Sequence, residues 1–395
     1  MYLTREEERM LKGEYGYAAQ KAMEILVALG KIYEADRMIE IKSAQISGVS
    51  YKNIGEEGLE FLLELAEDGR VRVPTTLNPC GMDLENWRKM EVPEDFADKQ
   101  LKVIEAYRKL GIKLTLTCTP YLAGNLPRFG DHLAWSESSA VIYANSVIGA
   151  RTNREGGPSA LAAAIAGRTP LHGLHLSENR APTIEILAPE LREEYEFAAL
   201  GFLVGKRFGD SVPLFRGLGA PSRDHLKALG AGLASGGGVA LFHVEGVTPE
   251  IVRDPGLAAD ERVEIELREL REVIEEFSDD FEEPDLVFIG CPHASIEEIT
   301  AFYEALRGRR VKRRTWIFAS RAVRDQAESL GLKRKLEELG AEIICDTCPI
   351  VAPIRSMGIR SVATNSAKAA YFSRNLNKLK VKLESIEELA EEAVK

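Results

Sequence analysis

The chain has 395 residues, of which 45% are hydrophobic and 29% charged, and its formal net charge at neutral pH is −11. This length exceeds one typical core and predicts two or three domains of ordinary globular type. The negative charge argues against a broad basic surface for nucleic acid or anionic membranes. There is no apolar run of about 18 residues that could cross a membrane. The first residues do not resemble a signal peptide, so we expect a cytoplasmic protein.

Apolar residues recur at helical spacing over 21–38, 55–69 and 94–111, which predicts three helices. Apolar or threonine-rich runs over 38–50, 70–81 and 113–121 predict strands between them. Alternating strands and helices favour βαβ units and a mostly parallel sheet. The stretch from about 131 to 255 is less regular and rich in glycine and alanine. Within it, residues 232–250 predict a glycine turn and a strand.

The segment 257–284 is strongly acidic and predicts a solvated helix and turn. After it, strands are predicted over 285–290, 313–320 and 341–348, with helices up to Leu306 and over 321–340. Residues 361–377 open as a strand and continue as a helix. The sequence therefore predicts a multi-domain α/β protein with largely parallel sheets flanked by helices. Its parts would be an N-terminal α/β region (1–256) that could form two lobes, an acidic helical connector (257–284) and a C-terminal α/β domain (285–395).

Glutamine occurs only as Gln20, Gln45, Gln100 and Gln326, whereas glutamate, lysine and arginine are abundant. Avoidance of thermolabile amides is typical of thermophilic proteins. A reducing cytoplasm argues against disulfides among the five cysteines, although hyperthermophiles are an exception.

Four of the five cysteines share one sequence context. Each follows an apolar or threonine-rich predicted strand and lies within two residues of a proline; they are Cys80, Cys118, Cys291 and Cys348. The carboxyl ends of parallel strands gather at one edge of a sheet, where open α/β proteins bind ligands. Cys291 illustrates this, because it follows the apolar run 286–289 and Gly290 and precedes a helical pattern behind Ser295. Cys345 lies inside its predicted strand and is expected to pack in the core.

Three interpretations of these cysteines stay open from the residues alone. They could be unrelated buried thiols. They could bind zinc or form a redox pair, for which only Cys345 and Cys348 have the CxxC spacing. Alternatively, three scattered thiolates could hold an iron–sulfur cluster whose open iron acts as a Lewis acid. His293 lies beside Cys291 and could touch such a site.

Several loops have the residue types of anion sites. Arg151 and Arg154 precede a Gly-Gly-Pro start of an alanine-rich helix, an arrangement that suits a carboxylate or phosphate. The loop 48–50 is small enough for close approach of a ligand to the backbone. Ser366 opens another helix with Lys368 in its first turn, which predicts either an anion site or an N-cap. Neither a GxGxxG motif nor a Walker loop occurs, which disfavours nucleotide binding.

The block YANSVIGARTNREGGPSALAAAIAGRTPLHGLHL, together with TCTPY, GCPHAS and CDTCPI, resembles the aconitase X family. The resemblance covers essentially the whole chain and implies a hydro-lyase related to aconitase. It is most similar to the archaeal two-subunit branch, whose members dehydrate 5-phosphomevalonate to anhydromevalonate phosphate in isoprenoid biosynthesis. Fused bacterial members dehydrate cis-3-hydroxyproline, which is the alternative activity. An alternative of another class is a non-catalytic anion-binding subunit with structural cysteines.

The resemblance also implies site residues and partners. One 4Fe–4S cluster would be held by Cys118, Cys291 and Cys348, so that the N-terminal region supplies one ligand and the C-terminal domain two. Substrate contacts would fall at Gly48, Val49, Ser50, Asn78, Pro79 and Lys368, with Ser366 less directly implied. A separate small subunit with the swivelling domain would bring the serine base. No catalytic base is therefore expected in this chain, and it should need its partner for activity.

Overall fold

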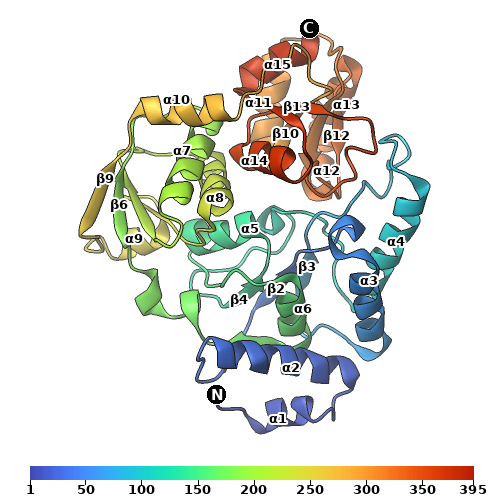
Figure 1. The fold of residues 1–395 in the computed structure, drawn as a ribbon, viewed down its shortest axis with the longest axis vertical. Helices are drawn as coiled ribbons and strands as arrows, with labels where there is room; N and C mark the ends of the chain where they lie inside the picture. The colour runs from blue at the N-terminus through green and yellow to red at the C-terminus, as the bar shows by residue number, and fades with distance from the viewer.

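Three parallel sheets flanked by helices organise the computed structural model, which describes residues 1–395 (Figure 1). The sheets have the strand orders β3-β2-β4, β8-β7-β6-β9 and β12-β11-β10-β13-β14. A short antiparallel pair, β1 (Met38–Glu40) and β5 (Arg168–Pro170), is the exception. The predicted α/β class with mostly parallel sheets is confirmed.

The first unit surrounds β2 (Ser43–Ile46), β3 (Thr75–Leu77) and β4 (Leu133–Trp135). The predicted helices over 21–38, 55–69 and 94–111 are present as α2, α3 and α4. The unit's helices are α1 (Arg5–Leu11), α2 (Tyr17–Ile32), α3 (Tyr51–Asp68), α4 (Glu94–Lys109), α5 (Ser138–Tyr143) and α6 (Gly157–Ala166). Short helical turns cover Pro120–Leu122, Ala144–Ile148, Gly173–His175 and Ser177–Arg180. The alanine-rich α6 packs against both α2 and β2, which explains why it is apolar on all sides.

Residues 113–121 do not form the predicted strand. Leu116 has a φ of +46°, which a regular strand does not allow. The Thr115 hydroxyl takes over the strand's role, because it accepts a hydrogen bond from the Leu77 N–H (3.1 Å) and donates to the Leu77 carbonyl (3.2 Å). The threonine-rich run thus binds β3 partly through a side chain, and Cys118 lies in an irregular loop.

The second unit contains β6 (Ile184–Leu187), β7 (Pro213–Arg216), β8 (His243–Val244) and β9 (Glu261–Glu264). Its helices are α7 (Glu194–Arg207), α8 (Arg223–Gly237), α9 (Pro249–Arg253) and α10 (Leu267–Glu276). The acidic segment 257–284 holds the predicted helix, α10, and also the unpredicted edge strand β9, which pairs in parallel with β6. The largely exposed β9 lacks the apolar alternation that announces a strand.

Helices α7 and α8 pack backbone against backbone. A Cβ atom on Gly201 would lie 2.1 Å from the Leu229 carbonyl oxygen, and one on Gly232 would lie 2.3 Å from that of Ala198. Only glycine allows this approach. The pair also packs against α5 of the first unit and α14 (Ala367–Asn375) of the third.

The third unit has the most regular α/β order. Its strands are β10 (Leu286–Ala294), β11 (Thr315–Ala319), β12 (Glu342–Ile344), β13 (Ser361–Thr364) and β14 (Lys380–Leu383). Its helices are α11 (Ile296–Leu306), α12 (Arg321–Ser329), α13 (Leu332–Leu339), α14 (Ala367–Asn375) and α15 (Ile386–Val394). The single helix predicted over 321–340 is divided at Gly331, which has a φ of +70°.

Strand β10 does not end at Gly290 as predicted. Its pairing with β11 stops after Ile289 and resumes only at Ala294. Gly290 has a φ of +96°, and a Cβ atom there would lie 2.1 Å from the Phe318 carbonyl oxygen. Cys291 therefore lies in a bulge where the backbone leaves the ladder, and the expected helix does begin behind Ser295.

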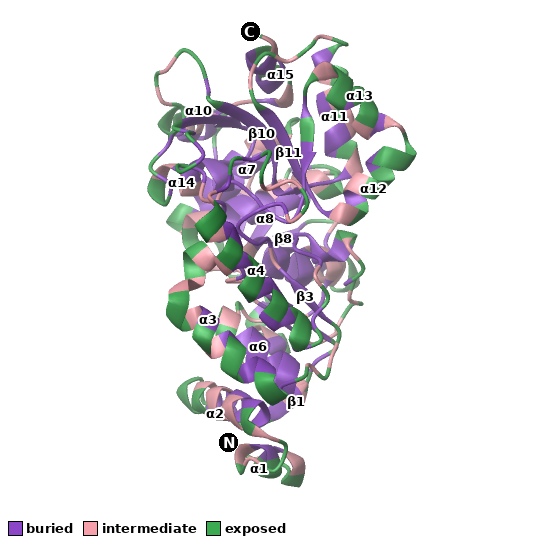
Figure 2. Ribbon diagram, turned by 90° about the vertical axis from the view of Figure 1, so that its right-hand side faces the viewer, coloured by how far each residue is buried: buried purple, intermediate pink, exposed green.

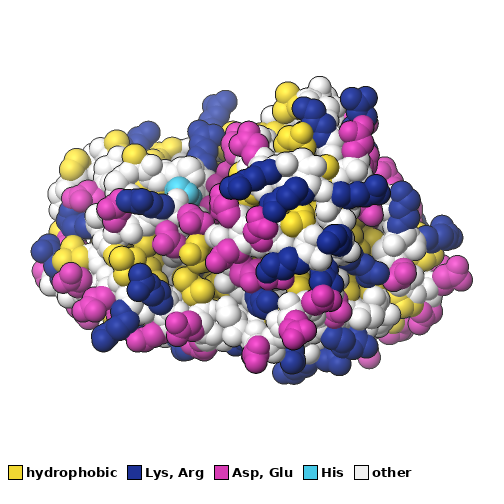
Figure 3. Space-filling model, turned by 90° about the horizontal axis from the view of Figure 1, so that it is seen from above, with side chains coloured by type: hydrophobic (Ala, Val, Ile, Leu, Met, Phe, Trp, Pro, Cys, Tyr) yellow, Lys and Arg dark blue, Asp and Glu magenta, His cyan; other side chains and the backbone are white.

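The three units share one interior. The largest apolar cluster includes Ile142 from the first unit, Phe242 from the second and Phe288 from the third, and Figure 2 shows buried residues continuing through the middle of the molecule. None of the helices combines the length and hydropathy that a membrane crossing requires. Basic and acidic side chains are interspersed over the face seen in Figure 3.

Candidate functional site

The loops that carry Cys118, Cys291 and Cys348 meet between the first and third units. All three thiols are buried and free. Burial raises the pKa of Cys118 well above its usual value, and the nearby Glu137, Cys348 and Cys291 raise it further. Burial likewise raises the pKa of Cys291 to about 12, with Cys348 among its neighbours. The structure thus brings the three predicted ligands together.

The three buried thiols are the candidate donor set for a metal centre. No three histidine, cysteine, aspartate or glutamate side chains lie close enough to bind one and the same metal ion. Three thiols on separate loops fit a cubane, in which each thiolate binds a different iron. Cys345 follows the end of β12 rather than lying inside the strand, and it is fully buried in the apolar core of the third unit, as expected.

His293 connects the three cysteine loops. Its Nδ1 lies 2.9 Å from the hydroxyl of Thr117, its Nε2 lies 2.9 Å from the carbonyl oxygen of Thr347, and its backbone N–H donates to the Cys118 Sγ at 3.2 Å. A carbonyl only accepts, so Nε2 carries the proton and Nδ1 accepts from Thr117. Burial lowers the pKa of His293 to about 4. The imidazole ring is therefore neutral, and both of its nitrogens form hydrogen bonds that connect the loops.

Lys368 lies in the first turn of α14 and is buried beside the cysteine loops. Its Nζ is 2.5 Å from Glu137 Oε1 and donates to the Ser139 hydroxyl, also at 2.5 Å. Burial alone would lower the pKa of Lys368, but Glu137, Cys291 and Cys118 outweigh burial and raise it. The lysine is therefore charged, and a carboxylate from the first unit already balances that charge.

Ser366 is the predicted N-cap of α14. It caps α14 by accepting from the Ala369 N–H at 3.1 Å, and it donates to the carbonyl oxygen of Cys291. The start of α14 is thereby attached to a candidate ligand loop.

The two predicted substrate loops lie on either side of Cys348 in their contacts: the loop 48–50 contacts the chain after it, and the loop after β3 pairs with Asp346 and Thr347 before it. The hydroxyl of Ser50 donates to the Val351 carbonyl at 2.8 Å. Asn78, followed by Pro79 after β3, accepts from Gln45 Nε2 at 3.4 Å, and the same Nε2 lies 3.3 Å from the carbonyl of Thr117. Gln45 thus links a substrate loop to the Cys118 loop.

A second buried glutamine, Gln100, holds both substrate loops. Its Oε1 accepts from the backbone N–H groups of Tyr51 and Gly81, each at 3.0 Å, and its Nε2 donates to the Val49 carbonyl at 2.9 Å. A primary amide suits this position, because its oxygen accepts two hydrogen bonds while its separate NH2 group donates in another direction. Sequence analysis missed both glutamines, and their rarity in this chain was the available signal.

The two arginines predicted to bind an anion lie elsewhere. Arg151 donates to the carbonyl of His175 at 2.9 Å, and Arg154 donates to that of Gly238 at 2.7 Å, where α8 ends. Arg154 lines a separate cavity that also contains Tyr33 and His172. The structure does not bring either guanidinium group to the cysteine loops.

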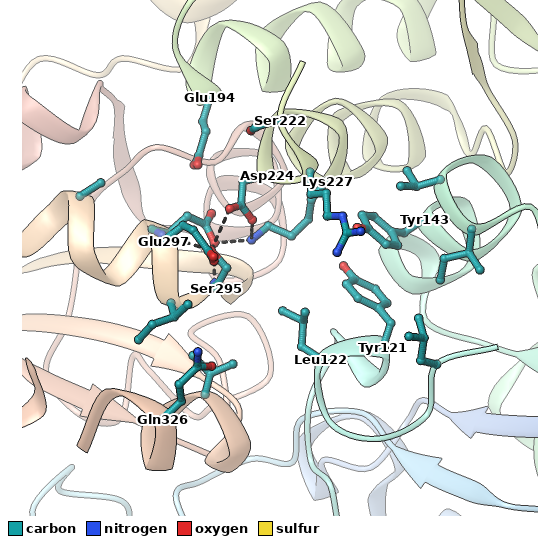
Figure 4. A pocket seen from close by; sticks show the side chains of 18 of the residues that line it. Tyr121, Leu122, Tyr143, Glu194, Ser222, Asp224, Lys227, Ser295, Glu297 and Gln326 are labelled. Atoms are coloured by element: carbon teal, nitrogen blue, oxygen red, sulfur yellow. Dashed lines mark hydrogen bonds and ion pairs between the residues drawn. The ribbon is translucent and has the colours of Figure 1, made fainter. Parts of the chain in front are cut away.

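A cavity of about 870 Å³ lies between the three units, close to the Cys118 loop (Figure 4). The volume suits a small molecule. Lys227 is buried in its wall, paired with Asp224 (2.8 Å) and with Glu298. The three units contribute in turn Tyr121, Leu122 and Tyr143; Glu194, Asp224 and Lys227; and Ser295, Glu297, Glu298 and Gln326. Sequence analysis assigned no cavity role to these residues, although Tyr121, Tyr143 and Ser295 fall within the motifs that carry the family resemblance.

The comparisons with known proteins agree with this architecture. Family models of the aconitase X first, second and third domains match residues 1–178, 182–275 and 284–395. The phosphomevalonate dehydratase large subunit of Thermococcus kodakarensis is 50% identical and aligns over 100% of both chains. That of Methanocaldococcus jannaschii is 48% identical over 98% of this chain and 99% of its own. The crystal structure of the holo form of Thermococcus kodakaraensis aconitase X has a TM-score of 0.93, 50% identity and full coverage of both chains.

The chain belongs to the aconitase X family. A more distant relative, the cis-3-hydroxy-L-proline dehydratase of Pseudomonas aeruginosa, is 36% identical over 98% of this chain but only 69% of its own length.

Proposed function

We propose that the chain is the large subunit of a hydro-lyase that converts (R)-5-phosphomevalonate to trans-anhydromevalonate 5-phosphate in the cytoplasm, as a step of the archaeal mevalonate pathway to isoprenoids. The observation that carries the proposal is the convergence of three buried thiols, a buried lysine and two small-residue loops between the units. Support comes from relatives of that name that match the chain from end to end.

We propose that Cys118, Cys291 and Cys348 hold one 4Fe–4S cluster. When bound, the cluster supplies an open iron as a Lewis acid for the departing hydroxyl group. The chain's own residues shape its surroundings: His293 fixes the spacing of the three loops, and Lys368 keeps a positive charge beside the thiols. Lys368 offsets the charge of Glu137 there, and the N–H groups at the start of α14 that Ser366 does not cap favour an anionic substrate.

The base that takes a proton from C2 is proposed to come from a small partner subunit with the swivelling domain. Two buried candidates in this chain are already engaged. His293 is neutral with both nitrogens hydrogen-bonded, and Glu137 pairs with Lys368 and caps α5 through the Ala140 N–H. Both side chains therefore serve the shape of the site.

The second candidate function is cis-3-hydroxy-L-proline dehydration. The relative with that name shares 36% identity, and this chain spans about two thirds of it. A third alternative is a non-catalytic subunit that binds an anion. In that case the cysteines would pack in the protein interior and would not bind iron.

Anaerobic reconstitution separates these functions. The chain is loaded with iron and sulfide, mixed with the small subunit, and given each substrate in turn, with product followed by NMR. We expect a brown protein that dehydrates phosphomevalonate only when the partner is present. Turnover of hydroxyproline alone would favour the second candidate, and a colourless protein that binds no iron would favour the non-catalytic subunit.

A further inference from the structure

Tyr121 has a buried hydroxyl group without a hydrogen-bond partner. The residue is 8% exposed, and its hydroxyl oxygen is one of the few buried side-chain polar atoms that no protein group satisfies. Its ring stacks on Tyr143, with 4.0 Å between the ring centroids and 10° between the planes. The ring is thus firmly held, while its polar end is left free. Such an orphan group is unfavourable and calls for a reason.

The position of Tyr121 suggests the reason. It follows Cys118 by three residues, in the turn Pro120–Leu122, and lines the cavity between the three units. Figure 4 shows Tyr121 and Tyr143 on one side of the cavity and Glu297 and Ser295 on the other. Besides burial and Tyr143, the charges of Cys118, Glu137 and Asp224 raise the pKa of Tyr121. Tyr121 thus belongs to the loop that carries Cys118 and also lines the cavity, and its hydroxyl stays protonated.

We infer that Tyr121 is a substrate-contacting residue, whose hydroxyl donates a hydrogen bond to an oxygen at the reacting end of a bound hydroxy acid. The inference rests on the proposed function and adds to it a specific donor and the cavity that admits the substrate. A neutral donor suits this place, because Lys227 opposite is already paired with Asp224 and Glu298. The apolar neighbours Leu122 and Val147 can face the carbon skeleton.

The test is Tyr121→Phe, which keeps the ring and its stacking and removes only the hydroxyl. We expect unchanged iron content and visible spectrum and an equal or higher melting temperature, because an unpaired buried group is removed. Affinity for phosphomevalonate, measured by calorimetry on the loaded enzyme, and kcat/KM with the small subunit should each fall about 10–100-fold, as for loss of one charge-assisted hydrogen bond. Tyr107→Phe, at a buried tyrosine of the first unit that does not line the cavity, is the control and should stay within about threefold of the parent. Tyr143→Phe, at the other member of the stacked pair, tests the rings themselves.

Each other outcome overturns something definite. If the parent enzyme turns over phosphomevalonate and Tyr121→Phe binds and reacts within about threefold of it, the inference fails while the proposed function stands. Equal losses in Tyr121→Phe and Tyr143→Phe would assign the effect to the stacked rings and would also refute it. Loss of iron in Tyr121→Phe would give the hydroxyl a structural role instead. A loaded parent that neither binds nor dehydrates phosphomevalonate would overturn the proposed function and the inference together.

Discussion

Replacing Lys368 by methionine should destabilise the chain strongly even without a cluster. The substitution leaves the carboxylate of Glu137 buried, with the Ala140 N–H (2.7 Å) and nearby hydroxyls as its remaining partners. Removing one partner of a buried ion pair costs about 3–5 kcal/mol. The double variant Lys368→Met/Glu137→Gln leaves no uncompensated charge. It should therefore be about 1–3 kcal/mol more stable than Lys368→Met alone, a coupling typical of residues in contact.

Urea unfolding of the metal-free chain at neutral pH measures these differences. The control is Lys99→Met, which breaks the half-exposed pair with Glu56 (2.7 Å) and should cost no more than about 1 kcal/mol. If Lys368→Met is no worse than Lys99→Met, the pair is not effectively buried. If the double variant loses the sum of the two single losses, Lys368 and Glu137 are not coupled and the reasoning is wrong.

Three further predictions concern the ligands, the substrate loops and the C-terminus. The variants Cys118→Ser, Cys291→Ser and Cys348→Ser should each bind less iron than the parent after anaerobic loading, because each loses one thiolate ligand. Cys345→Ser is the control and should keep the parent's iron content. Gln100→Met should lower the free energy of unfolding by about 2–4 kcal/mol. At full iron content it should also raise KM more than it lowers kcat. The control Gln20→Met should leave both the stability and the kinetic constants unchanged. Burial and the nearby Glu392 raise the pKa of Glu384 from 4.5 to about 7. Between these two pH values the folded state keeps a proton that the unfolded chain has released. The stability of the fold therefore falls as the pH rises from 4.5 to about 7. Glu384→Gln should match the parent near pH 4.5 and exceed it by about 1–3 kcal/mol at pH 8, and an equal difference at both pH values would contradict the assignment.

Sequence periodicity predicted the regular α/β stretches well because their signal is local. The spacing of apolar residues marks α2, α3 and α4, and the buried strands of the third unit read as short apolar runs. Periodicity failed at two places: where a side chain rather than the backbone pairs with a strand, and where a strand is largely exposed to solvent on both faces. Thr115 takes the place of backbone pairing in the loop before Cys118, and the exposed β9 has no buried face to show.

The site could be predicted only in part. Two lines of reasoning predicted the three cysteines that the structure brings close: their positions after predicted strands, and the resemblance to the family. The partner of Lys368 could not be predicted, because Glu137 is 231 residues away and nothing local marks the pairing. The bracing by His293 depends on three loops meeting, and the orphan hydroxyl of Tyr121 is visible only once its surroundings are known.

The glycine contact between α7 and α8 has a consequence for how the second unit folds. Glycine disfavours a helix by about 1 kcal/mol per residue relative to alanine, so neither helix should persist by itself. The two helices become stable only when their backbones pack together. The close packing that glycine makes possible offsets the helix stability that glycine costs. Helix formation and docking should then be a single cooperative event, seen as joint amide exchange across both helices. The glycines that meet the opposite backbone are Gly201, Gly205, Gly232, Gly236 and Gly237.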